Sequence, residues 1–352
     1  MLNLFFPGPL ATNSQRTGPK KISLALQGGG AHGAFTWGVL DHFLSDPRLE
    51  INGISGASAG AVNAVMLTDG LARGGRAEAQ KRLAEFWRAA SLGGNLPGPQ
   101  RAVFDRMLAL LPMRELPVQS FVDNVTRYLS PYALNPLDIN PLKDLIDSCV
   151  DFDAVRTFNA FQLFVAATNV HTGAARIFSR EEITADVVMA SAALPYLFRA
   201  VEIDGAPYWD GGYSGNPAIM PLIESSASSD IVVVQIVPEE RPTTPTSARD
   251  ILARINEITF NASLAADLRT IALIDRMIED GRLRPTGNYR SVNLHRISLI
   301  ERELIAASRL KTDFDFFEEL HAEGKRAALL FLAEHFADIG TRSTIELSTV
   351  AA

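Results

Sequence analysis

The chain has 352 residues, of which 47% are hydrophobic and 21% charged, so it is too apolar to be disordered and long enough to bury a large core. Its formal net charge of -7 argues against a general nucleic-acid-binding protein and provides no overall attraction to anionic lipid. The single cysteine, Cys149, excludes an intramolecular disulfide and has no second cysteine or histidine beside it, which indicates a small buried residue rather than a thiolate nucleophile.

The amino terminus begins with an apolar stretch, but Pro7 and Pro9 interrupt it and the first lysines, Lys20 and Lys21, come only after it. A secretory signal carries its basic residues before the apolar core. We therefore predict that residues 1–20 form a flexible tail and that the protein is cytoplasmic. No apolar run in the sequence reaches the roughly 18 residues that a membrane-spanning helix requires.

Short apolar runs alternate with helical patterns after this tail. The apolar runs predict strands at residues 21–27, 51–55, 161–168, 175–179, 231–237 and 291–297. Apolar residues at helical spacing predict helices at residues 34–44, 61–67, 75–90, 248–278 and 314–336, with the second of these ending near Gly70. The alternation of strand and helix in the first part predicts a mainly parallel sheet with helices on both faces.

Composition suggests how the chain is divided. Residues 91–141 hold seven of the 19 prolines, which predicts an inserted cap or lid. Its apolar side chains would cover an acyl groove, contact a membrane surface or pack as an ordinary inserted helix; they are Phe104, Met107, Leu108, Leu110, Leu111, Pro112 and Met113. We predict a catalytic domain at residues 21–238 and, packed on it, a C-terminal extension at residues 239–352.

The segment Gly56-Ala57-Ser58-Ala59-Gly60 matches the nucleophile elbow G-x-S-x-G, in which a serine stands on a sharp turn between a strand and a helix. Such a turn exposes the hydroxyl of Ser58, and the flanking Gly56 and Gly60 are small because neighbouring chain passes close to them. The positive end of the following helix favours a developing anion. Serines between glycines also occur in plain turns, so the pattern alone leaves that alternative open.

A glycine-rich loop precedes the elbow. The N–H groups of Gly28, Gly29 and Gly30 can converge on one point and hold the oxyanion of an acyl-transfer intermediate. The N–H group of Ala59, directly after the serine, is a second source of hydrogen bonds to that oxyanion. We therefore predict an oxyanion hole formed by these four residues.

The same loop also fits the dinucleotide-binding fingerprint G-x-G-x-x-G through Gly28, Gly30 and Gly33. That fingerprint requires an acidic residue at the far end of the second strand. Ser55 and Gly56 occupy this position, so we disfavour dinucleotide binding.

A base is needed to activate Ser58. Of the six histidines, His295, His321 and His335 come late enough in the chain to complete a Ser–Asp–His triad. Asp210 is the better candidate, because two glycines follow it and let the backbone pass close to a site. A simple turn is the alternative interpretation of this D-G-G segment.

Four sequence blocks together resemble the patatin-like phospholipase family in order and spacing over residues 21–225. They are Gly28-Gly29-Gly30-Ala31-His32-Gly33, Gly56-Ala57-Ser58-Ala59-Gly60, Ala190-Ser191-Ala192-Ala193-Leu194-Pro195 and Asp210-Gly211-Gly212. Residues 240–340 are similar, more weakly, to the C-terminal extension of a bacterial subset of this family.

The resemblance implies a three-layer α/β/α fold with a mainly parallel central sheet, a helical insertion and a C-terminal helical extension. It implies a Ser58–Asp210 dyad and an oxyanion hole in the glycine loop, without metal or cofactor. The residues that would support this site are His32, Gly33, Gly56, Gly60, Gly211 and Gly212. His32 departs from the family, many members of which have arginine or lysine there, and would be a weaker, pH-dependent positive charge.

The expected function is therefore hydrolysis of acyl esters in phospholipids or other lipids, with transient contact to a membrane surface and no nucleic-acid partner. An esterase or thioesterase acting on soluble acyl substrates is one alternative. A non-catalytic binding module with the same fold is another, disfavoured because both the serine and the aspartate are present.

Overall fold

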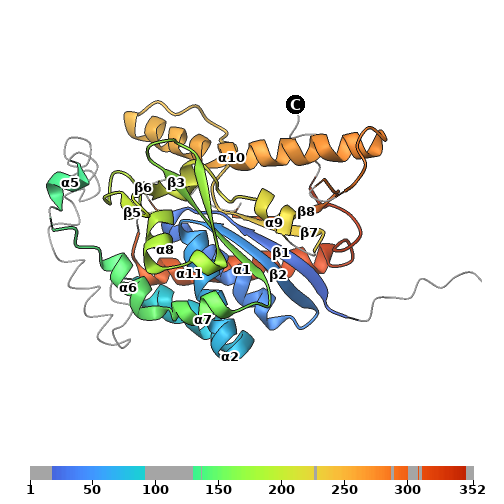
Figure 1. Cartoon of the computed structure of the whole chain (residues 1–352), viewed down its shortest axis with the longest axis horizontal. Coiled ribbons are helices and arrows are strands. Elements are labelled where there is room, and N and C mark those ends of the chain that lie inside the picture. Colours follow the sequence, from blue (N-terminus) through green and yellow to red (C-terminus); the bar gives the residue numbers. More distant parts are fainter. Residues whose placement is uncertain are drawn as a thin grey trace, which may run out of the picture.

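A computed structural model describes residues 18–91, 130–135, 137–225, 228–286, 289–299, 308 and 311–345. Helices lie on both sides of a central 8-stranded sheet (Figure 1). The predicted three-layer α/β/α fold is therefore confirmed. The proposed lid at residues 91–141 lies largely outside the described residues, as does nearly all of the predicted tail.

The sheet has the strand order β5-β6-β3-β2-β1-β7-β8, with β4 also paired to β3. Its strands are β1 (Lys20–Leu26), β2 (Leu49–Ala57), β3 (Gln162–Asn169), β4 (Ala175–Ser179), β5 (Val201–Ile203), β6 (Ala206–Asp210), β7 (Asp230–Gln235) and β8 (Asn293–Ser298). The five strands β1, β2, β3, β7 and β8 pair in parallel. The antiparallel strands β4, β5 and β6 lie on the β3 side of the sheet, and the predicted mainly parallel sheet is confirmed.

Helices follow or separate these strands. They are α1 (Gly33–Ser45), α2 (Ala59–Ala89), α5 (Pro131–Leu134), α6 (Pro141–Cys149), α7 (Phe152–Thr157), α8 (Ala185–Ser191), α9 (Met220–Ser225), α10 (Ala248–Glu279) and α11 (Phe314–His335). Short 3₁₀ turns occur at Gly30–His32, Arg180–Glu182 and Gly211–Tyr213. No helix in the described ranges is both long and apolar enough to cross a membrane.

Alternate residues of the central strands point to opposite layers of helices. Leu24 and Leu26 of β1 belong to a core shared with α1, α2 and α11. Ala25 between them, and Val233 of β7, belong to a second core shared with α9 and α10. The two-residue period of a strand thus explains why both faces of the sheet are apolar and both are covered.

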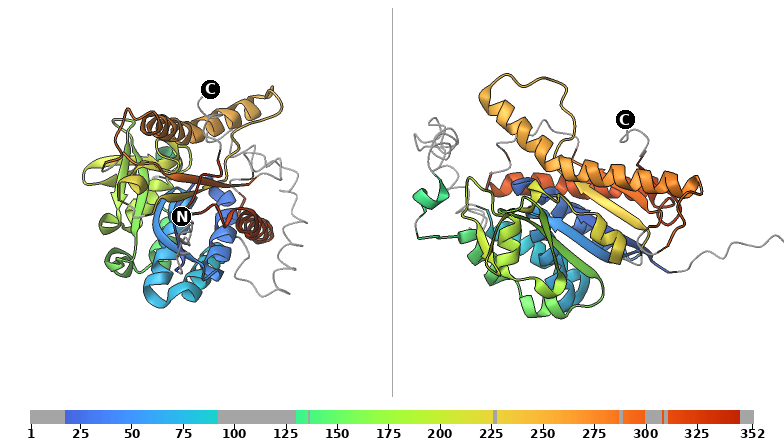
Figure 2. Two further views of the ribbon diagram at one scale, coloured as in Figure 1. Left: turned by 90° about the vertical axis from the view of Figure 1, so that its right-hand side faces the viewer. Right: turned by 45° about the horizontal axis from the view of Figure 1, so that its top comes forward.

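The C-terminal segment contributes to the sheet and to the main core. β8 pairs with β7, and α11 crosses α1 at close range. A methyl group on Gly38 of α1 would lie 2.0 Å from the carbonyl oxygen of His321, and one on Gly324 would lie 2.0 Å from that of Phe35. The two helices therefore pack backbone to backbone, and the left view of Figure 2 shows the dark-red α11 end-on beside the blue α1.

The expectation that a helix ends near Gly70 is wrong, because α2 continues through that position. The interruption lies at Gly75, which has φ 76° and ψ -158° inside the element. A methyl group on Gly70 would lie 2.3 Å from the Cα atom of Ala79, so Gly70 permits the second half of the helix to pack against the first. Its small size serves packing rather than termination.

Candidate active site

Ser58 stands on the turn between β2 and α2, at the carboxyl edge of the parallel strands. Its backbone has φ 53° and ψ -125°, a conformation that L-residues rarely adopt, and its exposed fraction is 6%. A strained serine between a strand and a helix is the arrangement that a nucleophile elbow requires. The surrounding structure must hold this conformation in place, since an isolated turn would relax it.

Close backbone contacts around the turn explain its glycines. A methyl group on Gly56 would lie 2.6 Å from the carbonyl carbon of Gly60, and one on Gly60 would lie 2.1 Å from the carbonyl oxygen of Leu26. A methyl group on Gly33 would likewise lie 2.6 Å from the Cβ atom of Ala59. These contacts show that the elbow and the glycine loop are pressed together.

Ser191 supports the elbow from behind. The N–H group of Ser58 donates to the Ser191 hydroxyl at 2.9 Å, and that hydroxyl donates to the Ala166 carbonyl at 2.7 Å. The block at residues 190–195 thus contacts the elbow through the end of α8. The hydroxyl of Ser191 thus links the turn that carries Ser58 to β3.

Asp210 ends β6 and is fully buried. Its Oδ1 atom accepts a hydrogen bond of 2.7 Å from the N–H group of Gly212. Burial raises the pKa of Asp210 to about 7, although the Gly212 N–H group and a hydrogen bond from the Ser58 hydroxyl lower the pKa in part. Among the described residues, the buried Oδ2 atom has no hydrogen-bond partner of ordinary geometry.

The two glycines after Asp210 are also required by contacts. A methyl group on Gly211 would lie 2.0 Å from the Ala166 carbonyl oxygen, and one on Gly212 would lie 2.4 Å from the ring of Phe260. The D-G-G segment is therefore more than a turn. It fits between β3 on one side and α10 on the other.

One residue of the glycine loop, Gly28, does not play the part that the sequence predicts. The N–H group of Gly28 donates to Oδ1 of Asn216 at 2.6 Å, so it is already used and the prediction that it serves an oxyanion hole is wrong in this structure. Gly28 instead packs on the nucleophile, since a methyl group there would lie 2.6 Å from the Cβ atom of Ser58. Gly29, Gly30 and Ala59 lie at the starts of helical turns, where N–H groups have no partner within the helix.

Sequence reasoning missed a buried polar network that holds this loop. Asn216 donates from Nδ2 to the carbonyl oxygens of Gly28 at 3.4 Å and Phe260 at 3.1 Å, besides accepting from the Gly28 N–H group. Gln27 donates to Oδ1 of Asn261 at 2.9 Å and accepts from two N–H groups that follow β7. The only signal in the sequence was an asparagine before a proline, which is typical of any turn.

The histidines do not join the proposed dyad. His32 is buried and its Nε2 atom lies 2.7 Å from the Ser308 hydroxyl, so it contacts the C-terminal segment rather than solvent. His295 lies 3.0 Å from Asp230, which begins β7 at the opposite edge of the sheet from Ser58. His321 and His335 lie 3.1 Å from Asp41 and Asp338, respectively.

Cys149 ends α6 and is half-buried, and burial raises the pKa of its thiol. A raised pKa keeps the thiol protonated at neutral pH. The expectation that it does not act as a thiolate agrees with this environment.

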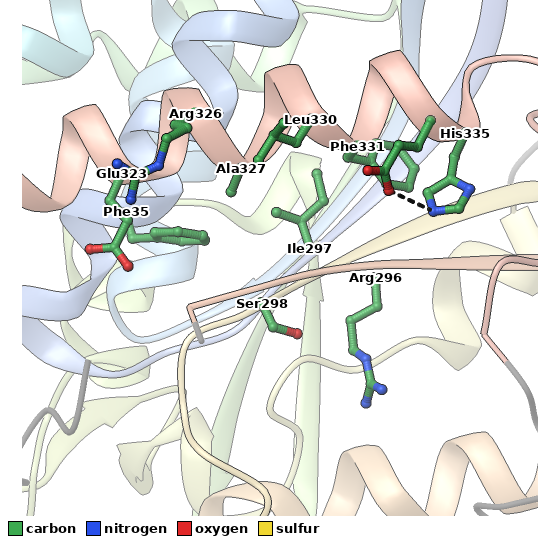
Figure 3. A pocket seen from close by; sticks show the side chains of 11 residues that line it. Phe35, Arg296, Ile297, Ser298, Glu323, Arg326, Ala327, Leu330, Phe331 and His335 are labelled. Carbon is green, nitrogen blue, oxygen red and sulfur yellow. Dashed lines mark ion pairs between the residues drawn. The ribbon is translucent and has the colours of Figure 1, made fainter. Parts of the chain in front are cut away.

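A cavity of about 240 Å³ lies elsewhere, between α11 and β8. Figure 3 shows Ala327 and Leu330 of α11 above Ile297 of β8, with charged side chains around them. Neither Ser58 nor Asp210 lines this cavity. It is thus separate from the candidate active site.

The sequence model that defines the patatin-like phospholipase family matches residues 24–223, more than half of the chain. The chain therefore belongs to the patatin-like phospholipase family. The matched range contains Ser58, Asp210 and the glycine loop, and it ends before α10.

Individual relatives are distant. The Escherichia coli (strain K12) protein named "Uncharacterized protein YjjU" is 25% identical over 233 residues, which cover 64% of this chain and 55% of that protein. The chain thus spans little more than half the length of this curated relative. VipD from Legionella pneumophila is 15% identical with a TM-score of 0.37, over 87% of this chain and 67% of VipD. The ExoU-SpcU complex from the type III secretion system of Pseudomonas aeruginosa gives 15% identity and a TM-score of 0.32, over 95% of this chain and 66% of the matched chain.

Proposed function

We propose that the protein is a serine acyl hydrolase that cleaves lipid acyl esters, of the phospholipase A or lipid acyl hydrolase type, through a Ser58–Asp210 dyad. The observation that carries this proposal is a serine on a strained strand-to-helix turn beside a fully buried carboxyl group whose pKa is raised to about 7. An ordinary aspartate is too weak a base at neutral pH, and this environment brings its pKa into the useful range. Membership of the patatin-like phospholipase family supports the choice of lipid esters.

The proposed reaction has two stages. Ser58 Oγ attacks the ester carbonyl carbon while its proton passes to the Asp210 carboxylate, which then protonates the departing alcohol. N–H groups of Gly29, Gly30 and Ala59 hold the oxyanion, and the positive end of α2 adds to its stabilisation. Water activated by Asp210 then attacks the acyl-enzyme, releasing the fatty acid and restoring Ser58. The mechanism uses no metal or cofactor.

Covalent labelling tests the nucleophile without assuming a substrate. We expect a fluorophosphonate probe to label the wild-type protein on Ser58 and to leave Ser58→Ala unlabelled, because only an activated serine reacts with it. Ser55→Ala is the matched control, since Ser55 is a buried serine on β2, the strand that leads to Ser58, and the variant should still be labelled. A wild-type protein that resists the probe, or a Ser58→Ala protein that reacts with it, would overturn the proposal.

Substrate class requires a separate comparison. Rates on p-nitrophenyl esters of increasing chain length, measured beside rates on phospholipid vesicles, distinguish a lipid hydrolase from an enzyme of soluble esters. We expect rates to rise with chain length and vesicle phospholipid to be cleaved. Activity confined to short soluble esters would favour the esterase alternative.

The side chain of Asn216 should position the glycine loop that carries the proposed oxyanion donors. We expect Asn216→Ala to lower kcat by up to about 100-fold with little change in KM, because a displaced loop misaligns the oxyanion donors more than it weakens substrate binding. Ser263→Ala is the control, since the Ser263 hydroxyl accepts the backbone N–H group of Asn216 and, within the part of the chain that the structure describes, has no hydrogen bond to the glycine loop. Equal effects of the two variants on kcat would mean that Asn216 serves stability alone.

A further inference from the structure

The outer face of α10 carries an apolar stripe that no described residue covers. Four large aliphatic side chains in its first half are exposed, and a fifth lies further along: Ile251, Leu252, Ile255, Ile258 and Leu273 have exposed fractions from 42% to 55%. Positions 251, 255, 258, 262 and 266 follow helical spacing, with alanines at the last two, so they form one line. This line is about 22 Å long at 1.5 Å per residue.

The charges of α10 divide between its two faces. Across positions 251–276, all of which the structure describes, no acidic side chain is exposed, whereas Arg269 and Arg276 are. Glu257 is buried and lies 2.7 Å from Arg241, and Asp267 accepts from the Ile219 N–H group at 3.1 Å. Between positions 251 and 276 this outer face is therefore apolar and its exposed charges are positive, whereas the exposed acidic residues of α10, Asp250 and Glu279, lie at its two ends.

The inner face of the same helix contacts residues next to the proposed active site. Phe260 packs on Gly212, two residues after Asp210, and Asn261 bonds to Gln27 beside the glycine loop. Because a helix with its side chains is about 10–12 Å across, whatever contacts the outer face lies one helix diameter from the site. Figures 1 and 2 show α10 along an outer edge of the molecule.

We propose that the outer face of α10 docks the protein on an anionic phospholipid bilayer, an inference that rests on the proposed function in taking the bilayer as the source of substrate. Aliphatic residues along one line, with Arg269 and Arg276 continuing it and no exposed acidic residue between positions 251 and 276, suit insertion at a lipid interface with attraction to anionic headgroups. A protein partner fits less well, because the exposed stripe contains no tyrosine or tryptophan, the residues that dominate protein-binding hot spots.

Vesicle flotation of the Ser58→Ala protein tests docking apart from hydrolysis. We expect it to float with vesicles of equimolar phosphatidylcholine and phosphatidylglycerol and to bind pure phosphatidylcholine more weakly. In this background, Ile255→Asp with Ile258→Asp should lower the affinity about tenfold or more, because two aliphatic anchors become charged. Arg269→Gln with Arg276→Gln should lower it about fivefold per arginine on the anionic vesicles.

The matched control is Leu329→Asp on α11, because Leu329 and Ile258 have the same exposed fraction of 55%. This variant should float like its parent, and thermal unfolding should show that every variant is folded. Equal flotation of parent and Ile255→Asp, Ile258→Asp proteins would overturn the proposal. So would a dimer that these substitutions dissociate, since the stripe would then bind a second copy. If the wild-type protein bound vesicles but hydrolysed no ester, the proposed function would be overturned, whereas the proposed docking surface would not.

Discussion

Replacing Ser58 by alanine should abolish ester hydrolysis, with a loss in kcat of roughly 10,000-fold to 1,000,000-fold. Removal of the nucleophile prevents the acyl-enzyme from forming, and the remaining oxyanion donors can then stabilise only direct attack by water. The measurement is the steady-state rate on a long-chain p-nitrophenyl ester, with the variant protein purified separately from any wild-type enzyme.

A second substitution at the same position separates chemistry from backbone strain. Ser58→Gly should be equally inactive but more stable than Ser58→Ala by about 1–3 kcal/mol, because glycine adopts φ 53° without the cost paid by an L-residue. Urea unfolding of the two variants measures this difference. Residual activity near that of wild type in either variant would contradict the assignment of Ser58.

Asp210→Asn should remove activity and also stabilise the protein at alkaline pH. The pKa of Asp210 is raised from 3.8 to about 7 by burial, so the folded state binds its proton more tightly than the unfolded state does. The stability due to this group is therefore full below about pH 4 and is lost as pH rises to about 7. The full loss is at most about 4 kcal/mol, at 1.36 kcal/mol per pKa unit.

The neutral asparagine lacks this penalty, so the stability of the variant should exceed that of wild type above pH 7 and converge with it near pH 4. Urea unfolding of both proteins across this range provides the test. The wild-type rate should rise with pH through an apparent pKa near 7, as the carboxylate becomes available to accept the Ser58 proton. A stability difference that does not change with pH, or a fully active Asp210→Asn protein, would contradict the proposed role.

Local sequence patterns predicted the parts of the site that depend on close backbone approach. Gly56 and Gly60 around Ser58, and the two glycines after Asp210, each meet backbone or a ring within 2.6 Å of an added methyl group. Because only glycine fits such contacts, these positions form a short motif that can be recognised in the sequence. The main strands and long helices were predictable for a similar reason, since burial imposes a regular period on apolar residues.

Contacts between distant segments could not be predicted in this way. Asn216 bonds to Gly28 across 188 residues, and Asn261 bonds to Gln27 across 234 residues. Amide side chains have no preferred spacing in the sequence, so nothing local distinguishes these from surface asparagines and glutamines. The same limit explains why Gly28 was assigned to the oxyanion hole, because its N–H group is occupied by a residue far along the chain.

The close crossing of α1 and α11 has a consequence for how the protein is made. The serine and the glycine loop are synthesised early, but the helix that packs on α1 begins only at Phe314 and the network on the loop requires α10. A nascent chain that has emerged only as far as residue 238 carries Ser58 and Asp210 without either support. The order of synthesis thus delays completion of the proposed lipid hydrolase until α10 and α11 have left the ribosome.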